Sequence, residues 1–236
     1  MNRHLVTTDI HGMYDELVQL LDIVKYDPTN DVLVNLGDSI HRGPKSAECI
    51  KFLRNYADIA LMGNHEEKEL KIRKARRQGT AQAEWKFNWN EHHLEVDLSL
   101  DDEDVSWIEG LPYYYELDVE GKKWVLCHAG LLPWRRLEDT KKSVFSHLRY
   151  VNEKGNATRI EQDKNAVHWA SVWNGPHNVI YGHHVGSEKY PVINTINGYT
   201  TIGLDTGACF GGMLSMLILP TMEIVQVPGT KYRELH

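Results

Sequence analysis

Five short polar segments, in a fixed order along the chain, constrain the fold more than any other feature of the sequence. The first three each follow a predicted strand and precede a predicted helix. In open α/β sheets, such strand ends meet in the crevice where ligands bind. The sequence therefore predicts an α/β fold that brings the segments together at one edge. They are T-T-D-I-H-G, G-D-S-I-H-R-G-P, G-N-H-E, C-H-A-G and Y-G-H-H, at residues 7–12, 37–44, 63–66, 127–130 and 181–184.

The apolar patterns around these segments predict alternating strands and helices in the first half of the chain and mostly strands in the second. Residues 32–36 form a nearly continuous apolar run, which is typical of a strand covered on both faces. This order favours two packed sheets with helices on their outer faces. Predicted helices cover residues 14–24, 45–56, 66–78 and 101–109, and predicted strands cover residues 4–8, 32–36, 58–62, 113–119, 124–127, 179–181, 200–204, 213–219 and 223–227.

Length and composition exclude several classes of protein. The 236 residues suit one domain covering residues 1–236, and the polar, aperiodic residues 79–99 are expected to form an insertion or lid. A formal net charge of −7 disfavours a general nucleic-acid binder. There is no membrane-length apolar run and no secretory core at the N-terminus, so we expect a cytoplasmic protein without a membrane partner. Cys49, Cys127 and Cys209 are expected to be reduced core thiols.

The side chains of the five segments are those that a pair of divalent cations requires. Such a pair needs a shared carboxylate, further carboxylate, amide and imidazole ligands, and open positions. Asp9 and His11 flank a single residue at a strand end, so both can face one ion. Asp38, about one β-α-β unit further on, is the expected bridge between the ions. The second site would be completed by Asn64, His128 and His183.

The same segments supply groups for phosphate chemistry. His65, adjacent to Asn64, is placed to act as a general acid for the leaving oxygen. Arg42 and Arg149 offer planar guanidinium groups that can clamp phosphate oxygens. A water between the two ions would ionise near neutral pH and attack phosphorus in line. The residues therefore predict a two-metal phosphoesterase.

At these segments the chain resembles the calcineurin-like metallophosphoesterase superfamily, and within it the phosphoprotein-phosphatase branch. That branch shows D-x-H-G, G-D-x-x-D-R-G, G-N-H-[DE], H-A-G and a late G-H, and the resemblance covers nearly the whole chain. Residues 43–48, 148–150, 173–183 and 203–214 look most similar to ApaH-like phosphatases, which are kin of the symmetrical diadenosine tetraphosphate hydrolase. The resemblance implies an α/β/β/α sandwich and the two metal sites sharing Asp38. It also implies manganese as the usual ion, with iron, zinc, cobalt or magnesium as alternatives.

One position departs from the pattern of the branch. The second Asp of G-D-x-x-D-R-G, which in the branch supports the catalytic histidine, is His41 here. A neutral imidazole also accepts a hydrogen bond, but through one ring nitrogen and without a full negative charge. We expect His41 to support His65 from behind and not to bind metal. His184, which follows the late G-H, stays unassigned.

The expected substrates are phosphorylated small molecules or polyphosphates, with dinucleoside polyphosphates such as diadenosine tetraphosphate first. The alternative is a serine/threonine or broad-specificity protein phosphatase of bacterial or phage type, whose substrate is a phosphoprotein. A module that binds metals but is inactive because of His41 is a further alternative. The basic run at residues 68–77 is expected to be a solvated helix face, with contact to a polyanion as its alternative.

Overall fold

Both ends of the chain contribute to the first of two five-stranded sheets. The computed structural model describes residues 2–79 and 90–232. The strand order in this sheet is β13 (Glu223–Pro228), β12 (Met213–Leu219), β1 (Arg3–Thr7), β2 (Asp31–Asn35) and β3 (Ile59–Ala60). Strands β1, β2 and β3 run parallel, while β12 and β13 add antiparallel pairs beside β1.

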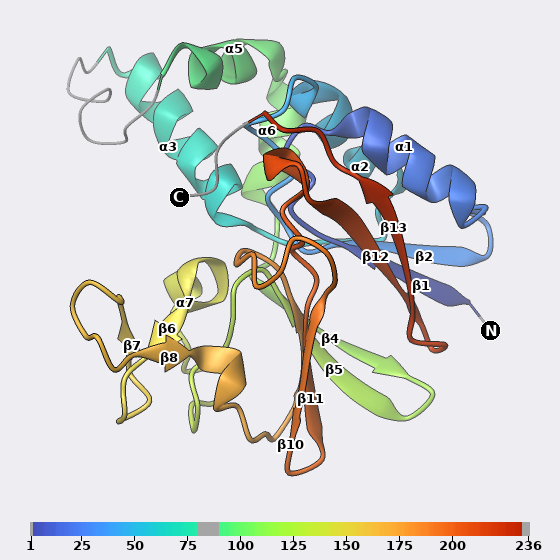
Figure 1. Ribbon diagram of the computed structural model, residues 1–236. Coiled ribbons are helices and arrows are strands. Elements are labelled where there is room, and N and C mark those ends of the chain that lie inside the picture. Colours follow the sequence, from blue (N-terminus) through green and yellow to red (C-terminus); the bar gives the residue numbers. More distant parts are fainter. Residues whose placement is uncertain (1, 80–89, 233–236) are drawn as a thin grey trace.

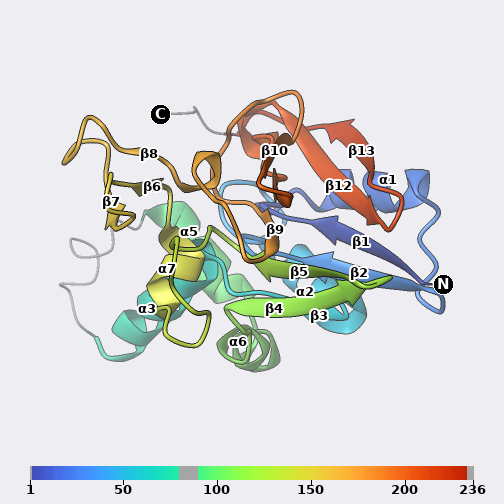
Figure 2. The ribbon, with the colours of Figure 1, turned by 90° about the horizontal axis from the view of Figure 1, so that it is seen from below.

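The second sheet comes from the second half of the chain. Its central strands β5 (Lys122–Cys127), β9 (Asn178–Tyr181) and β11 (Tyr199–Gly203) are parallel, and β4 (Tyr114–Val119) and β10 (Val192–Ile196) pair antiparallel at its edges. Figure 1 shows the first sheet above the second, and Figure 2 shows the two layers from below. The strand order is β10, β11, β9, β5 and β4.

Alternation along the strands divides the apolar side chains between two cores. In β1, Leu5 packs among residues of α1 (Tyr14–Ile23) and α2 (Ser46–Tyr56), whereas Val6 packs between the two sheets. Successive strand residues point to opposite faces, so a strand buried on both faces has to be apolar almost throughout. The core between the sheets also includes Leu36, Trp124, Ile180, Ile202 and Leu217.

Helices and short elements cover the outer faces. A helical group of α3 (Asn64–Arg77), α5 (Glu91–Ser99) and α6 (Asp102–Glu109) lies beside α2 (Figure 1). The second sheet is covered by α7 (Lys142–His147) and the 3-10 helix Trp169–Ser171, whose aromatic side chains pack on β5 and β9. A second 3-10 helix, Ala208–Phe210, follows β11. A small sheet of β7 (Ala157–Thr158), β6 (Tyr150–Val151) and β8 (Val167–His168) lies near α7 at the edge of the molecule (Figure 1).

The structure confirms the predicted α/β architecture of two packed sheets flanked by helices, and Cys49, Cys127 and Cys209 are free and buried. Strand β3 has two residues where five were predicted, and β10 and the small sheet were not predicted. The insertion or lid at residues 79–99 stays a prediction. Residues 80–89 lie outside the described residues, and Glu91–Ser99 forms α5, which packs through Val96. Among the described residues, no helix has the length and apolar character needed to cross a membrane.

Candidate metal centre

Five loops at neighbouring edges of the two sheets carry the predicted metal ligands and His65, whereas Arg149 lies between α7 and β6. The loop after β1 carries Asp9 and His11, and the loop after β2 carries Asp38. Backbone hydrogen bonds join these two loops: the Asp9 N–H donates to the Gly37 carbonyl (3.0 Å) and the His11 N–H to the Asp38 carbonyl (2.9 Å). The start of α3 and the loops after β5 and β9 supply Asn64, His65, His128 and His183.

A first cluster consists of Asp9, His11 and Asp38. Nδ1 of His11 lies 3.0 Å from the carbonyl oxygen of Ile40. A carbonyl only accepts, so the neutral ring carries its proton on Nδ1 and its Nε2 lone pair is free. This Nε2 lies 3.7 Å from Oδ1 of Asp9 and 3.7 Å from Oδ2 of Asp38. Burial, followed by the charge of Arg42, lowers the pKa of His11 to about 3, so the ring is neutral and able to bind a cation.

A second cluster consists of Asp38, Asn64, His128 and His183. Nδ1 of His128 lies 3.1 Å from the carbonyl oxygen of Leu36, so the ring directs Nε2 into the cluster. That Nε2 lies 3.0 Å from Oδ1 of Asn64 and 3.4 Å from Oδ1 of Asp38. Burial opposes a charged ring, but the charges of Asp38 and Asp9 raise the pKa of His128 to about 9, so Nε2 of the metal-free protein is protonated and donates to these oxygens. A bound cation would take the place of this proton among the same oxygen atoms. The ring centroid of His183 lies 5.1 Å from that of His128.

Asp38 faces both clusters with different oxygens. Its Oδ2 is directed to His11 and its Oδ1 to His128. Ligand-forming atoms of His11, Asp38 and His65 lie within 4.8 Å of one another, and so do those of Asp38, His128 and His183. Carboxylate oxygens and imidazole nitrogens, joined by the amide oxygen of Asn64, form a donor set that fits two divalent cations around a shared carboxylate.

Both ring nitrogens of His65 are in contact with other side chains. Nδ1 lies 3.0 Å from Nδ1 of His41, and Nε2 lies 3.3 Å from Nη2 of Arg42. His41 is buried behind His65, and its Nε2 lies 2.8 Å from Oε2 of Glu69. Glu69 lies within α3, outside the five polar segments, and was not predicted.

Two further buried carboxylates belong to the site and were not assigned from the sequence. Glu66 accepts from the backbone N–H groups of Asp38 (2.8 Å) and Gly63 (3.1 Å), and so fixes the loop that carries Asp38. Burial, followed by the charge of Asp38, raises the pKa of Glu66 to about 7. The second carboxylate is Asp205, in the loop after β11. After burial, its charge is the next cause that raises the pKa of Asp9. The place of Glu66 in G-N-H-E and that of Asp205 after β11 were the available signals.

The two arginines predicted to bind phosphate have different surroundings. Arg42 lies with its guanidinium 4.8 Å from the ring centroid of Phe210, and its Nη1 donates to Sγ of Cys209 (3.4 Å). Arg149 is exposed, and its Nε donates to Nε2 of His183 (3.1 Å). The structure therefore places Arg42 beside His65 and Arg149 beside the second cluster.

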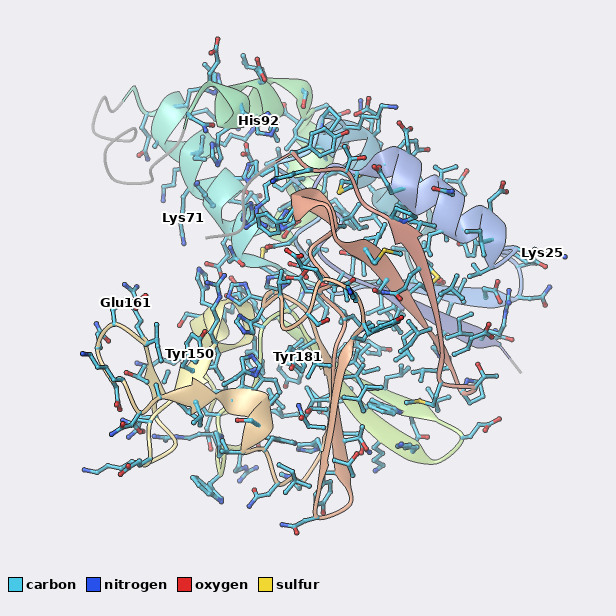
Figure 3. All side chains as sticks on the ribbon, viewed as in Figure 1. Lys25, Lys71, His92, Tyr150, Glu161 and Tyr181 are labelled. Atoms are coloured by element: carbon cyan, nitrogen blue, oxygen red, sulfur yellow. The ribbon has the colours of Figure 1, made fainter. Side chains whose placement is uncertain are left out.

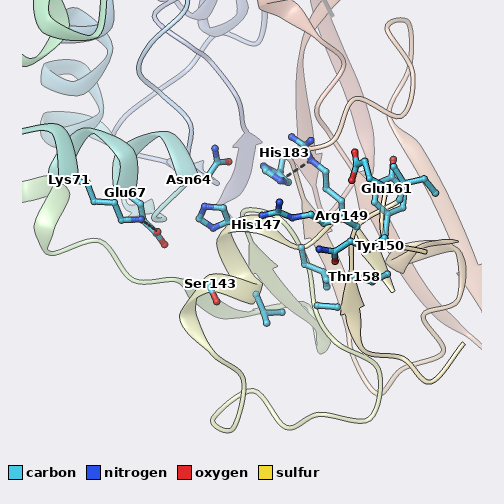
Figure 4. Close-up of a pocket in the computed structure, with 16 residues that line it drawn as sticks. Asn64, Glu67, Lys71, Ser143, His147, Arg149, Tyr150, Thr158, Glu161 and His183 are labelled. Carbon is cyan, nitrogen blue, oxygen red and sulfur yellow. Dashed lines mark hydrogen bonds and ion pairs between the residues drawn. The ribbon is translucent and has the colours of Figure 1, made fainter. Parts of the chain in front are cut away.

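A cleft of about 990 Å³ adjoins the second cluster. Lys71 of α3 lies on one side, whereas Tyr150 and Glu161 lie on the other (Figure 3). The close-up in Figure 4 shows Arg149 in contact with His183 within this cleft. Further lining residues are Asn64, Glu67, His147, Thr158 and Arg159.

The basic run of α3 is largely paired with carboxylates. Arg73 is buried, which corrects the expectation that the whole run is solvated, and it donates to Asp97 (3.0 Å). Arg76 pairs with the same carboxylate, and Arg77 pairs with Asp102 (2.7 Å). These pairs reduce the charge that α3 could offer to a polyanion.

The backbone of the site is unusual, because six of its residues have left-handed φ angles between 49° and 70°. Residues other than glycine seldom adopt these angles, although Asp and His do so more often than most. Each such conformation costs on the order of 1–3 kcal/mol and persists only when the surrounding structure enforces it. The six residues are Asp9, His11, Asp38, His41, Arg42 and His183.

Two facing sheets with carboxylate and imidazole clusters around one shared aspartate define a metal-dependent hydrolase of the phosphoesterase class. The sequence profile of the calcineurin-like phosphoesterase family matches residues 3–202. The chain belongs to that family, which confirms the resemblance seen in its sequence.

Comparison with individual proteins gives similarity over nearly the whole chain. The chain is 28% identical over 222 residues to serine/threonine-protein phosphatase 1 of Salmonella typhimurium, covering 91% of both chains. It is 26% identical over 283 residues to a symmetrical bis(5'-nucleosyl)-tetraphosphatase of Baumannia cicadellinicola, covering 95% of this chain and 92% of that protein. The crystal structure of a candidate diadenosine tetraphosphatase matches with a TM-score of 0.77 and 26% identity, covering 97% of this chain and 94% of the other.

Proposed function

We propose that the protein hydrolyses phosphoanhydride bonds in dinucleoside polyphosphates such as diadenosine tetraphosphate. The observation that carries the proposal is the cleft beside the second cluster, whose volume of about 990 Å³ suits a bound small molecule. Cationic Arg149 and Arg159 in this cleft suit a chain of phosphates, and the ring of Tyr150 suits a base. The names of the Baumannia relative and of the solved structure support the same class of substrate.

The proposal includes two divalent cations. The resemblance to the family makes manganese the first expectation, with iron, zinc, cobalt or magnesium as alternatives. Carboxylate and amide oxygens suit manganese, and imidazole nitrogens suit zinc and iron. When bound, such a pair supplies Lewis acidity, which neutralises phosphate charge and acidifies a water molecule. Asp9, His11 and Asp38 would hold one ion, and the other would be held by Asp38, Asn64, His128 and His183.

The remaining residues of the site orient the phosphate and move a proton. Arg42 and Arg149 would neutralise and orient phosphate oxygens. His65 would give a proton from Nε2 to the leaving oxygen. Burial lowers the pKa of His65 and the charge of Asp38 opposes this effect. A bound phosphate close to Nε2 would favour the protonated ring further, since nearby negative charge stabilises the cation.

A serine/threonine protein phosphatase is the second candidate. It is favoured by the match to the Salmonella enzyme over 91% of both chains. A module that binds metals without activity is distinguished from both candidates by measuring metal content together with turnover.

A substrate panel with manganese-loaded protein tests the proposal. Diadenosine tetraphosphate, a phosphoserine peptide and 4-nitrophenyl phosphate are compared, with nucleotide products separated by ion-exchange chromatography. Two ADP molecules from diadenosine tetraphosphate indicate symmetrical cleavage, whereas ATP plus AMP indicates asymmetrical cleavage. A higher kcat/KM for the phosphopeptide would favour the protein phosphatase. Bound metal without turnover of any substrate would refute the hydrolase.

Arg159→Ala tests the role of the cleft, because Arg159 lines it without belonging to either cluster. Loss of one charged hydrogen-bond donor should raise KM for diadenosine tetraphosphate by roughly 10- to 100-fold and leave KM for 4-nitrophenyl phosphate unchanged. Arg136→Ala is the matched control, since Arg136 is exposed and pairs with Glu138 outside the cleft. Equal effects of Arg159→Ala on the two substrates would contradict binding of the larger one in this cleft.

A further inference from the structure

The position where the related branch has Asp is occupied by His41, and the structure shows a carboxylate behind it. His41 is buried between His65 and Glu69, with Nδ1 3.0 Å from Nδ1 of His65 and Nε2 2.8 Å from Oε2 of Glu69. Glu69 is itself buried, and it comes from α3 rather than from the loop of His41. An unbroken chain of contacts therefore leads from His65 through a second imidazole to a carboxylate.

The direction of the hydrogen bonds follows from Arg42. Its Nη2 lies 3.3 Å from Nε2 of His65, and a guanidinium group can only donate. Nε2 of neutral His65 therefore accepts, and its proton is on Nδ1. Nδ1 of His41 must then accept the hydrogen bond from this Nδ1–H, so the proton of the neutral His41 ring is on Nε2. The only role left for Oε2 of Glu69 is that of acceptor from this Nε2–H.

The charges around these three hydrogen-bonded side chains are compatible with this direction of the hydrogen bonds. Burial, followed by the charges of His93 and Lys68, lowers the pKa of His41, so the ring between the two partners is neutral. Burial and the charge of Asp97 raise the pKa of Glu69 to about 8. The other oxygen of Glu69, Oε1, is buried and has no hydrogen-bond partner within residues 2–79 and 90–232. A proton held on Oε1 leaves Oε2 as an acceptor, so both states of the carboxyl group support the chain.

We propose that Glu69 and His41 act together as a positioning pair that fixes the tautomer and orientation of His65. Glu69 keeps the proton of His41 on Nε2, so that Nδ1 of His41 accepts a hydrogen bond from Nδ1 of His65. This contact leaves Nε2 of His65 available for the substrate. When protonated His65 gives its Nε2 proton to the leaving oxygen, it returns to the neutral Nδ1–H form that His41 holds. The inference rests on the proposed function only in taking His65 as the acid.

Tautomers can be read directly by two-bond ¹⁵N–¹H spectroscopy of the imidazoles. We would record spectra of the protein loaded with diamagnetic zinc, and assign the signals with His41→Gln and His65→Gln variants. The expected result is the Nδ1–H form of His65 and the Nε2–H form of His41. A His41 ring with its proton on Nδ1 would overturn the inference. This measurement does not require turnover, so failure of the proposed function and failure of the positioning pair are distinguishable.

A double-mutant cycle provides the kinetic test. Glu69→Leu removes the acceptor and should lower kcat roughly 10- to 100-fold, a part of the 10²–10⁴ that a general acid contributes, with KM and metal content unchanged. The loss should be larger for an alkyl phosphate than for 4-nitrophenyl phosphate, whose leaving group needs less protonation. Glu69→Gln keeps an acceptor oxygen and should recover most of the turnover. In a His41→Asp background, where aspartate accepts from His65 directly, Glu69→Leu should cause no loss.

Stability effects are separated with a matched buried carboxylate. Asp104 lies in α6, is buried, and has Arg54 as its partner (3.4 Å). Asp104→Asn should lower the unfolding midpoint without changing kcat. Equal losses of kcat from Glu69→Leu in the wild-type and His41→Asp backgrounds would show a purely structural role for Glu69 and overturn the inference.

Discussion

We predict that the affinity for divalent cations increases about tenfold for each pH unit between pH 7 and 9. Burial opposes a charged ring at His128, but the carboxylates of Asp38 and Asp9 outweigh it and raise the pKa of His128 to about 9 in the metal-free protein. An imidazole must be neutral to bind a metal. Below this pKa, binding therefore displaces a proton from His128, at about 1.4 kcal/mol for each pH unit.

Protonation of His128 weakens metal binding, but it stabilises the folded state of the metal-free protein. The folded-state pKa of His128, about 9, lies above the ordinary value of 6.5. Its contribution to stability is therefore fully present below pH 6.5 and is lost as the pH rises to 9. The difference between the two values corresponds to about 3 kcal/mol. Raising the pH over this range should lower the unfolding free energy of the metal-free protein while it strengthens metal binding.

Calorimetric titration with Mn²⁺ in buffers of different ionisation enthalpy measures the proton release. At least one proton per protein should be released at pH 7, and the contribution of His128 should vanish at pH 10. Chemical unfolding of chelator-treated protein at pH 6.5 and 9 measures the second effect. Binding without proton release at pH 7, or a metal-free fold that is equally stable at both pH values, would refute the reasoning that Asp38 keeps His128 protonated.

Three further predictions concern single residues. Asp38→Asn should lose at least one bound metal and most turnover while circular dichroism stays native, and unchanged metal content by mass spectrometry would contradict its place between the clusters. Arg42→Ala and Arg149→Ala should each raise the activation free energy by roughly 2–4 kcal/mol without loss of metal. If Arg149→Ala leaves kcat/KM unchanged on every phosphate substrate, Arg149 is an ordinary surface residue. His41→Ala should keep both metals, and loss of metal from this variant would show that His41 is a ligand. His41→Asp should retain or raise turnover and shift the acid side of the pH profile of turnover.

The sheets and the two clusters could be anticipated because their determinants are local in the sequence. Asp9, His11 and Asp38 each follow an apolar strand by a few residues, and parallel strands bring their ends to one edge. Strand β2 could be recognised because burial on both faces leaves a nearly continuous apolar run. Strands β6, β7 and β8 have two residues each, which is too short for any period to show in the sequence.

Glu69 illustrates what the sequence could not reveal. It is one of several charged residues in α3, and nothing in its neighbours distinguishes it from a solvated position. Its contact with His41, 28 residues earlier, depends on how α3 packs beside the loop after β2. Arg73 was misjudged for the same reason, since its partner Asp97 lies in another helix. Contacts between elements are set by tertiary packing, which a periodic pattern does not encode.

The left-handed backbone at the site has a consequence for the evolution of this chain. Glycine adopts such φ angles without a steric penalty, so a glycine in place of His41 or Arg42 would relieve the backbone while removing the functional side chain. Activity and stability are therefore opposed at these positions. A lineage selected only for folding would be free to lose these side chains, and the gain in stability would make the loss difficult to reverse.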